Sequence, residues 1–112
     1  MKKVLEDIFN DILEISDINM QKKMWLNENN DTGLISSYVE LMNRLFDDNN
    51  FSYVIENEAI ALDLEPELIF ALKTLRNALD GYVDKETDQE IITDPKWIEI
   101  SEQAKSIIKM WT

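Results

Sequence analysis

The chain has 112 residues and a mass of 13.1 kDa, which suits one domain spanning residues 1–112. Eleven Lys and Arg face 23 Asp and Glu, so the formal net charge is −12 and direct binding to nucleic acid or to an anionic membrane is unfavourable. The chain has neither Cys nor His, which excludes disulfides, thiol nucleophiles, imidazole catalysis and Cys/His metal sites. The composition therefore predicts no cofactor.

The N-terminal residues do not form a pattern typical of a targeting signal. Lys2 and Lys3 could begin a signal peptide, but Glu6, Asp7 and Asp11 interrupt any apolar stretch after them. The longest unbroken apolar run covers residues 68–72, which is too short to span a bilayer. We therefore expect a cytoplasmic location.

The first third of the chain has the apolar spacing of two helices. In the first segment adjacent apolar residues recur four positions apart and form one stripe on a helix: Val4, Leu5, Ile8, Phe9, Ile12 and Leu13. Asp17 is expected to cap a second helix, which carries Met20, Met24 and Trp25 as core-filling residues. The polar run over residues 27–33 predicts a loop.

The middle of the chain predicts two more helices. Ser37 and Glu40 fit a capping box, and the helix that follows places one set of residues on a single face: Tyr38, Leu41, Met42, Leu45 and Phe46. Residues 51–55 have β-propensity and permit a strand. Helical spacing, however, favours a helix with this buried face: Phe51, Val54, Ile55, Ala59 and Leu62.

The last third begins with Pro66, which is well placed at the first position of a helix that Gly81 ends. Residues 84–93 are mostly polar and predict an exposed loop. Asp94 and Pro95 then begin a final helix, whose Trp111 could either pack at the edge of the protein or stand exposed. Because only two Gly and two Pro interrupt the chain, we predict an all-α fold, a compact bundle of five or six short amphipathic helices.

Two acidic loops alternate oxygen-bearing residues as calcium-binding loops do, but neither fits such a site. In the loop that begins at Asn27, Thr32 stands at the sixth position, where Gly is needed, and Tyr38 stands at the twelfth, where Glu is needed. In the loop that begins at Asp84, Gln89 and Pro95 occupy these positions. No dedicated metal site is therefore expected.

Charge is distributed unevenly along the chain. No Lys or Arg occurs between Arg44 and Lys73, whereas this interval holds seven acids. One interpretation is a solvated face that maintains solubility, and the other is a docking surface for a basic protein. Phe51 and Tyr53 could anchor the partner within that surface. The predicted binding residues are Asp47, Asp48, Phe51, Tyr53, Glu56, Glu58, Asp63, Glu65 and Glu67.

Two segments, residues 36–51 and the helix that begins at Asp94-Pro95-Lys96-Trp97-Ile98, resemble small acidic all-α immunity proteins of bacterial polymorphic toxin and contact-dependent growth inhibition systems. With the Leu-rich segment 68–79, the likeness covers about half of the chain. The resemblance implies a cytoplasmic inhibitor without catalytic activity. Such an inhibitor binds and neutralises a cognate basic toxin domain, often a nuclease. The family does not fix the contact residues, so those named above come from charge placement alone.

Two other classes of function are compatible with the residues. A regulatory adaptor or antitoxin would bind a partner helix in an apolar groove, and its complex would resist added salt. An enzyme that uses two carboxylates would need a cleft in which their pKa values differ, and no sequence feature singles out such a pair. We therefore expect a binding protein that is not an enzyme, and we expect it to be a monomer.

Overall fold

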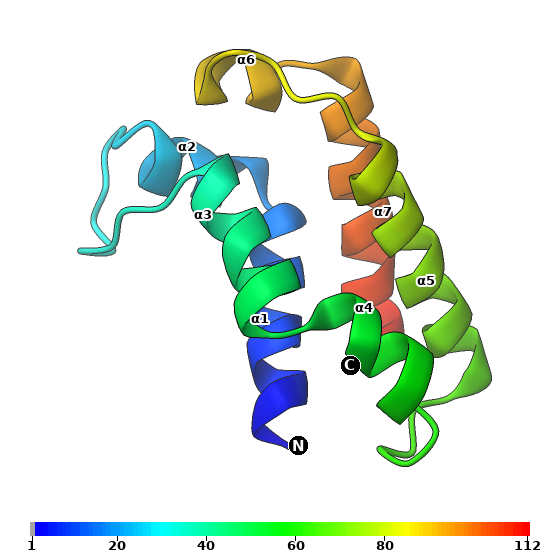
Figure 1. The fold of residues 1–112 in the computed structure, drawn as a ribbon. Helices are drawn as coiled ribbons and strands as arrows, with labels where there is room; N and C mark the ends of the chain where they lie inside the picture. Colours follow the sequence, from blue (N-terminus) through cyan, green and yellow to red (C-terminus); the bar gives the residue numbers. More distant parts are fainter. Residues whose placement is uncertain (1) are drawn as a thin grey trace.

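The computed structural model describes residues 2–112, and no strand forms within them. The predicted all-α fold is therefore confirmed (Figure 1). Two of the helical segments, Asn43–Asp48 (η1) and Val54–Glu58 (η2), have π-helical hydrogen bonding. In chain order the elements are α1 (Lys3–Ile15), α2 (Ile18–Trp25), α3 (Tyr38–Met42), η1 (Asn43–Asp48), α4 (Phe51–Tyr53), η2 (Val54–Glu58), α5 (Pro66–Gly81), α6 (Asp88–Ile92) and α7 (Pro95–Trp111).

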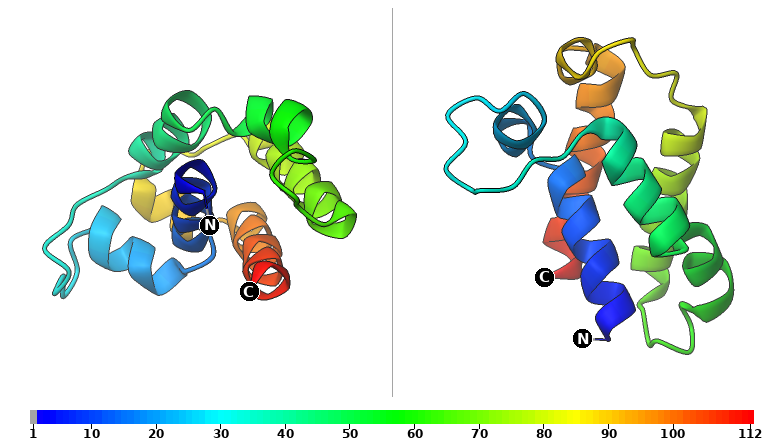
Figure 2. Two further views of the ribbon diagram at one scale, coloured as in Figure 1. Left: turned by 90° about the horizontal axis from the view of Figure 1, so that it is seen from below. Right: turned by 60° about the vertical axis from the view of Figure 1, so that its left-hand side comes forward.

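The three long helices form the frame of the bundle. Helix α7 packs along α1 on one side and along α5 on the other, while α2 and η1 also contact α1. Figure 2 shows α1 near the centre, with the row from α3 to η2 along one side of the molecule. The radius of gyration is 13.8 Å, close to the roughly 13 Å expected of a compact chain of this length.

Side-chain caps fix the starts of three helices as the sequence predicts. The Asp17 carboxylate accepts a hydrogen bond from the backbone N–H of Met20 at 3.0 Å. The Ser37 hydroxyl accepts one from the N–H of Glu40, also at 3.0 Å. Asp94 accepts one from the N–H of Lys96 at 3.1 Å, and Pro95 occupies the first helical position. Each cap satisfies a backbone donor that has no partner within its own helix.

The predicted apolar stripes form the core. On α1 the central residues Leu5, Ile8 and Ile12 are buried, and Val4, Phe9 and Leu13 at the edges are half-buried. The segment from Phe51 is helical and not a strand. It begins as α4 and continues as η2, and it buries Phe51, Val54, Ile55 and Ala59. The helical period in the sequence thus outweighed local β-propensity.

The prediction of an exposed loop over residues 84–93 is wrong in its second half. Residues Asp88–Ile92 form α6, and Ile91 and Ile92 are each only 2% exposed. Thr87 caps this helix by accepting from the N–H of Glu90, and its hydroxyl also donates to the Glu90 carboxylate. The Thr87-x-x-Glu90 capping box before an Ile-Ile pair was the sequence signal for this helix.

The tryptophans fill space, as predicted for Trp25, and lie in two places. Trp25 and Trp97 are buried, with ring centroids 6.0 Å apart, and Tyr38 and Tyr82 pack around them. Trp111 is half-buried at the edge of the bundle, where it meets Phe9 edge-on at 5.3 Å. Among residues 2–112, no helix combines the length and apolar character needed to cross a membrane.

Candidate functional site

The segment from the end of η1 to the first turn of α5 carries all nine of the predicted binding residues. It runs along the lower end of the bundle in Figure 1. Six of its seven acids form no ion pair with a basic residue in the described part of the chain; five of these six are exposed and Glu58 is half-buried. We call these six residues the acidic face: Asp47, Asp48, Glu58, Asp63, Glu65 and Glu67.

Glu56, the seventh acid of this interval, does not belong to the acidic face. Its carboxylate lies 2.8 Å from the guanidinium of Arg76 and 3.6 Å from Nζ of Lys73, both on α5. The hydrogen bond from Arg76 lowers the pKa of Glu56. The sequence interval is free of basic residues, but folding brings two of them onto this acid. The assignment of Glu56 as an unopposed negative charge is therefore corrected.

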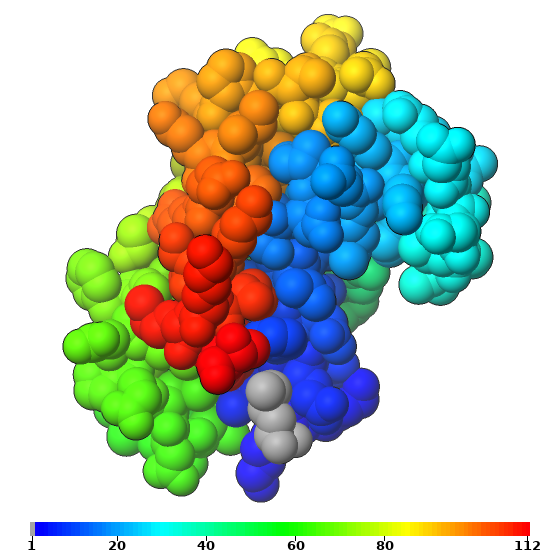
Figure 3. Space-filling model, turned by 180° about the vertical axis from the view of Figure 1, so that it is seen from behind, coloured from blue at the N-terminus to red at the C-terminus, as the bar shows by residue number. Residues whose placement is uncertain are grey.

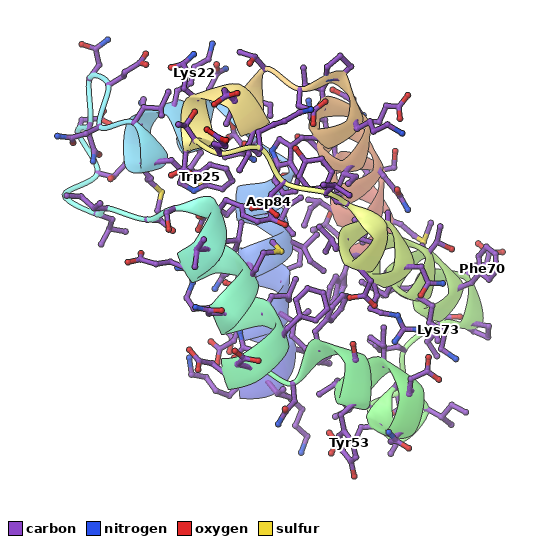
Figure 4. All side chains as sticks on the ribbon, turned by 45° about the horizontal axis from the view of Figure 1, so that its top comes forward. Lys22, Trp25, Tyr53, Phe70, Lys73 and Asp84 are labelled. Atoms are coloured by element: carbon purple, nitrogen blue, oxygen red, sulfur yellow. The ribbon has the colours of Figure 1, made fainter. Side chains whose placement is uncertain are left out.

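The structure separates the two predicted aromatic anchors. Phe51 is fully buried and meets Phe46 edge-on at 5.8 Å, so it belongs to the core and cannot contact a partner. Tyr53 is 57% exposed and points outward, as does Phe70 on α5 (Figure 4). Ile60 and Phe70 are 84% and 73% exposed, yet neither was predicted. Both fall outside the apolar stripes of their segments, which was the available signal.

Part of the acidic face lines a groove of about 600 Å³ between the start of α5 and the last turn of α7. Its rim carries Asp63, Glu65 and Glu67, and its apolar surface includes Leu68 and Trp111. Figure 3 shows these two chain segments side by side at the lower part of that view. The sequence does not predict that the C-terminal turn meets residues 63–68, because no local pattern encodes this contact.

A buried polar cluster lies away from this surface, between α1, α2 and η1. The Glu14 carboxylate accepts hydrogen bonds from Nε1 of Trp25, from the Ser36 hydroxyl and from the guanidinium of Arg44, all at 2.9 Å. Asp11 accepts from Asn49 at 2.7 Å. This cluster was not predicted, although Asp11 shares a helix face with Ile8, Ile12 and Ile15 and so could have been recognised as a buried acid.

The charge of this cluster is only partly compensated. Nε of Arg44 is buried, has no hydrogen-bond partner and lies 3.7 Å from the Asp11 carboxylate. Burial raises the pKa of Asp11 to about 6, against the opposing effects of the Arg44 charge and the Asn49 hydrogen bond. A hollow of about 260 Å³ beside the cluster is lined by polar residues, Asp7 and Asp48 among them. The contacts of the cluster join successive elements, so its role is structural.

The acids of residues 2–112 do not gather into a group of three or more that could hold a metal ion. In the loop over residues 27–33 the side chains bond within the loop: Asn30 donates to Asn27 and to the carbonyl of Leu34. Asp31 pairs with Lys23 at 3.2 Å, and this contact lowers the pKa of Asp31. The side-chain oxygens of Asn27 and Asp31 thus already have partners, namely Asn30 and Lys23.

Comparisons of the chain with protein-family models, with curated protein sequences and with solved structures found no match. Function is therefore inferred from the geometry and charge of the surface described above.

Proposed function

We propose that this protein is an immunity protein that binds and neutralises a basic toxin domain, a nuclease, by covering it with the acidic face. The observation that carries the proposal is the exposure of five unpaired carboxylates, together with half-buried Glu58, at one end of the bundle of a protein whose net charge is −12. A nuclease cleft is lined with cations that bind phosphates. A rigid surface with a similar density of negative charge would occupy such a cleft in place of nucleic acid.

Two kinds of contact would contribute to recognition, one to the association rate and the other to the dissociation rate. The carboxylates would accelerate encounter with a basic partner and select against acidic ones. Exposed Tyr53, Ile60 and Phe70 would then bury apolar surface and slow dissociation. In this scheme the protein makes and breaks no covalent bond, and it protects the cytoplasm of the cell that produces the toxin.

A specific observation also favours the second candidate, an adaptor or antitoxin that binds a partner helix. Leu34, Ile35 and Val39 are 60%, 74% and 60% exposed, and they lie close together in sequence where the loop meets α3. Such a patch could hold an apolar helix face. The two candidates differ in their response to salt, because only the acidic face would bind less tightly as ionic strength rises.

The test begins with the reading frame beside the gene, which should encode a basic toxin-like domain. That domain is co-expressed with the protein, and capture, association rate and inhibition are measured. Reversing Asp47, Asp48 and Asp63 to Lys should slow association about tenfold or more and flatten its dependence on salt. Reversing Glu28, Glu86 and Glu99, which are exposed elsewhere, is the matched control. Equal effects of both triple variants would move the interface away from the acidic face.

A further inference from the structure

The groove between α5 and α7 combines two chemical characters that a single occupant has to satisfy. Asp63, Glu65 and Glu67 on its rim are exposed and form no ion pair within residues 2–112, and no Lys or Arg of that range lines the groove. The lining also includes apolar Leu68 and half-buried Trp111. An occupant that suits this groove has positive charge at its tip and an apolar stem.

The three carboxylates also have a simpler explanation, which accounts for part of their placement. Glu65 precedes the first residue of α5 and Glu67 lies in its first turn, where negative charge stabilises the helix dipole. That effect does not require an apolar hollow beside them, nor does it involve Asp63, which stands outside the helix. The helix dipole therefore does not explain the groove.

We propose that the groove receives an arginine side chain of the basic partner, an inference that rests on the proposed function. A guanidinium is planar, bonds carboxylates through two N–H groups at once and stacks on the face of an indole. A lysine ammonium has the charge but neither the plane nor the paired donors. The arginine stem would lie over Leu68 and Trp111, with its guanidinium among the rim carboxylates.

The three indole N–H groups of the protein provide a site-specific measurement. Those of Trp25 and Trp97 donate to Glu14 and Gln21 in the interior. Trp111 lies on the groove, so its indole N–H resonance reports on occupancy while the other two serve as internal controls. The full-length chain, labelled with nitrogen-15, is titrated with three capped peptides of the sequence Ala-X-Leu-X-Ala, in which X is arginine, lysine or uncharged citrulline.

The arginine peptide should shift the Trp111 resonance, and the lysine peptide should bind several-fold more weakly. Changing Asp63→Asn, Glu65→Gln and Glu67→Gln together should weaken binding of the arginine peptide about tenfold, because charge-assisted hydrogen bonds are lost. Met110→Lys, which brings a cation to this groove, should weaken it as well. The amide triple Glu28→Gln, Glu86→Gln and Glu99→Gln has the same change of charge and should leave binding unchanged.

Several outcomes would overturn the inference. An unmoved Trp111 resonance would show that the groove is not the binding site, and equal loss in both triple variants would show non-specific attraction. Equal affinity for arginine and lysine, or for citrulline, would exclude arginine recognition. A Trp111 shift that depends on protein concentration without peptide would assign the groove to a second copy of the chain. Failure here with intact capture of the toxin domain would leave the proposed function standing, and lost capture with intact peptide binding would overturn that function alone.

Discussion

The guanidinium of Arg44 donates to the carboxylate of Glu14 at 2.9 Å, a bond that joins η1 to α1 across 30 residues of sequence. The same guanidinium lies 3.2 Å from the Ser36 hydroxyl, which itself donates to Glu14. The pair thereby fixes the end of the loop between α2 and α3 against α1. Because both acids that face Arg44 are buried, Asp11 and Glu14 depend on it for compensation of charge.

Arg44→Met should strongly destabilise the protein, since it leaves two buried carboxylates with no positive partner. We expect the free energy of unfolding to fall by about 3–5 kcal/mol. Arg76→Met is the matched control, because Arg76 pairs with the more exposed carboxylate of Glu56 and its loss should cost at most about 1 kcal/mol. Urea unfolding followed by circular dichroism measures both. Similar losses in the two variants would show that the cluster around Glu14 contributes no more to stability than the exposed ion pair does.

Asp11 should make stability depend on pH in an unusual direction. Its pKa rises from 3.8 to about 6 on folding, so the native state binds the proton more tightly than the unfolded state does. This contribution to stability is therefore present in acid and lost as the pH rises between these two values. The loss is on the order of 2–3 kcal/mol by pH 7.

The variant Asp11→Asn isolates this effect, because its side chain does not titrate. The free energy of unfolding of the variant relative to the parent should increase between about pH 4 and pH 7. Asn49 can reverse its amide and accept from the amide introduced by this substitution, so the contact is kept. Asp47→Asn, at an exposed carboxylate, should differ from the parent by less than about 0.5 kcal/mol throughout. A constant difference for Asp11→Asn would refute the raised pKa.

Whether the sequence predicts a structural feature depends on how far apart its interacting residues lie along the chain. The caps at Asp17, Ser37 and Asp94 and the stripe on α1 are local, so periodicity and residue type were sufficient. The ion pair between Glu56 and Arg76 spans 20 residues and depends on how η2 lies on α5. No pattern within either helix specifies that contact.

In the candidate site too, local features were predictable and long-range contacts were not. Counting charges located the acids of the middle segment, and their exposure followed from their position off the apolar stripes. That Asp63, Glu65 and Glu67 line the same groove as Trp111 could not be predicted, because the groove forms only when the last turn of α7 reaches α5. Phe51 was assigned both to a buried face and to a binding surface, and the structure retains only the first.

Phe51 and Tyr53 provide a direct test of which aromatic residue faces outward. Phe51→Ala should lower the free energy of unfolding by about 3–5 kcal/mol, because it leaves a cavity among buried residues. Tyr53→Ala, two residues away on the same helix, should change it by less than about 0.5 kcal/mol. Thermal and urea unfolding distinguish these outcomes. A costly Tyr53→Ala with a tolerated Phe51→Ala would mean that this helix is rotated about its axis.

Gln21 should be as important to the core as an apolar residue, although it is polar and fully buried. Its amide nitrogen donates to the carbonyls of Glu14 and Ile15 at the end of α1, and its oxygen accepts from Nε1 of Trp97. Gln21→Met keeps the length of the side chain but leaves the carbonyl of Ile15 and Nε1 of Trp97 without partners in the interior, while the carbonyl of Glu14 still accepts from the N–H of Asp17. We expect a loss of about 2–4 kcal/mol and a shift of the Trp97 indole proton resonance. Gln103→Met, at a half-buried position of α7 itself, should cost less than about 0.5 kcal/mol. If both variants were tolerated equally, α2 would not be held to α7 through this amide, and the contacts of α2 with α1 and α6 would have to hold it in place.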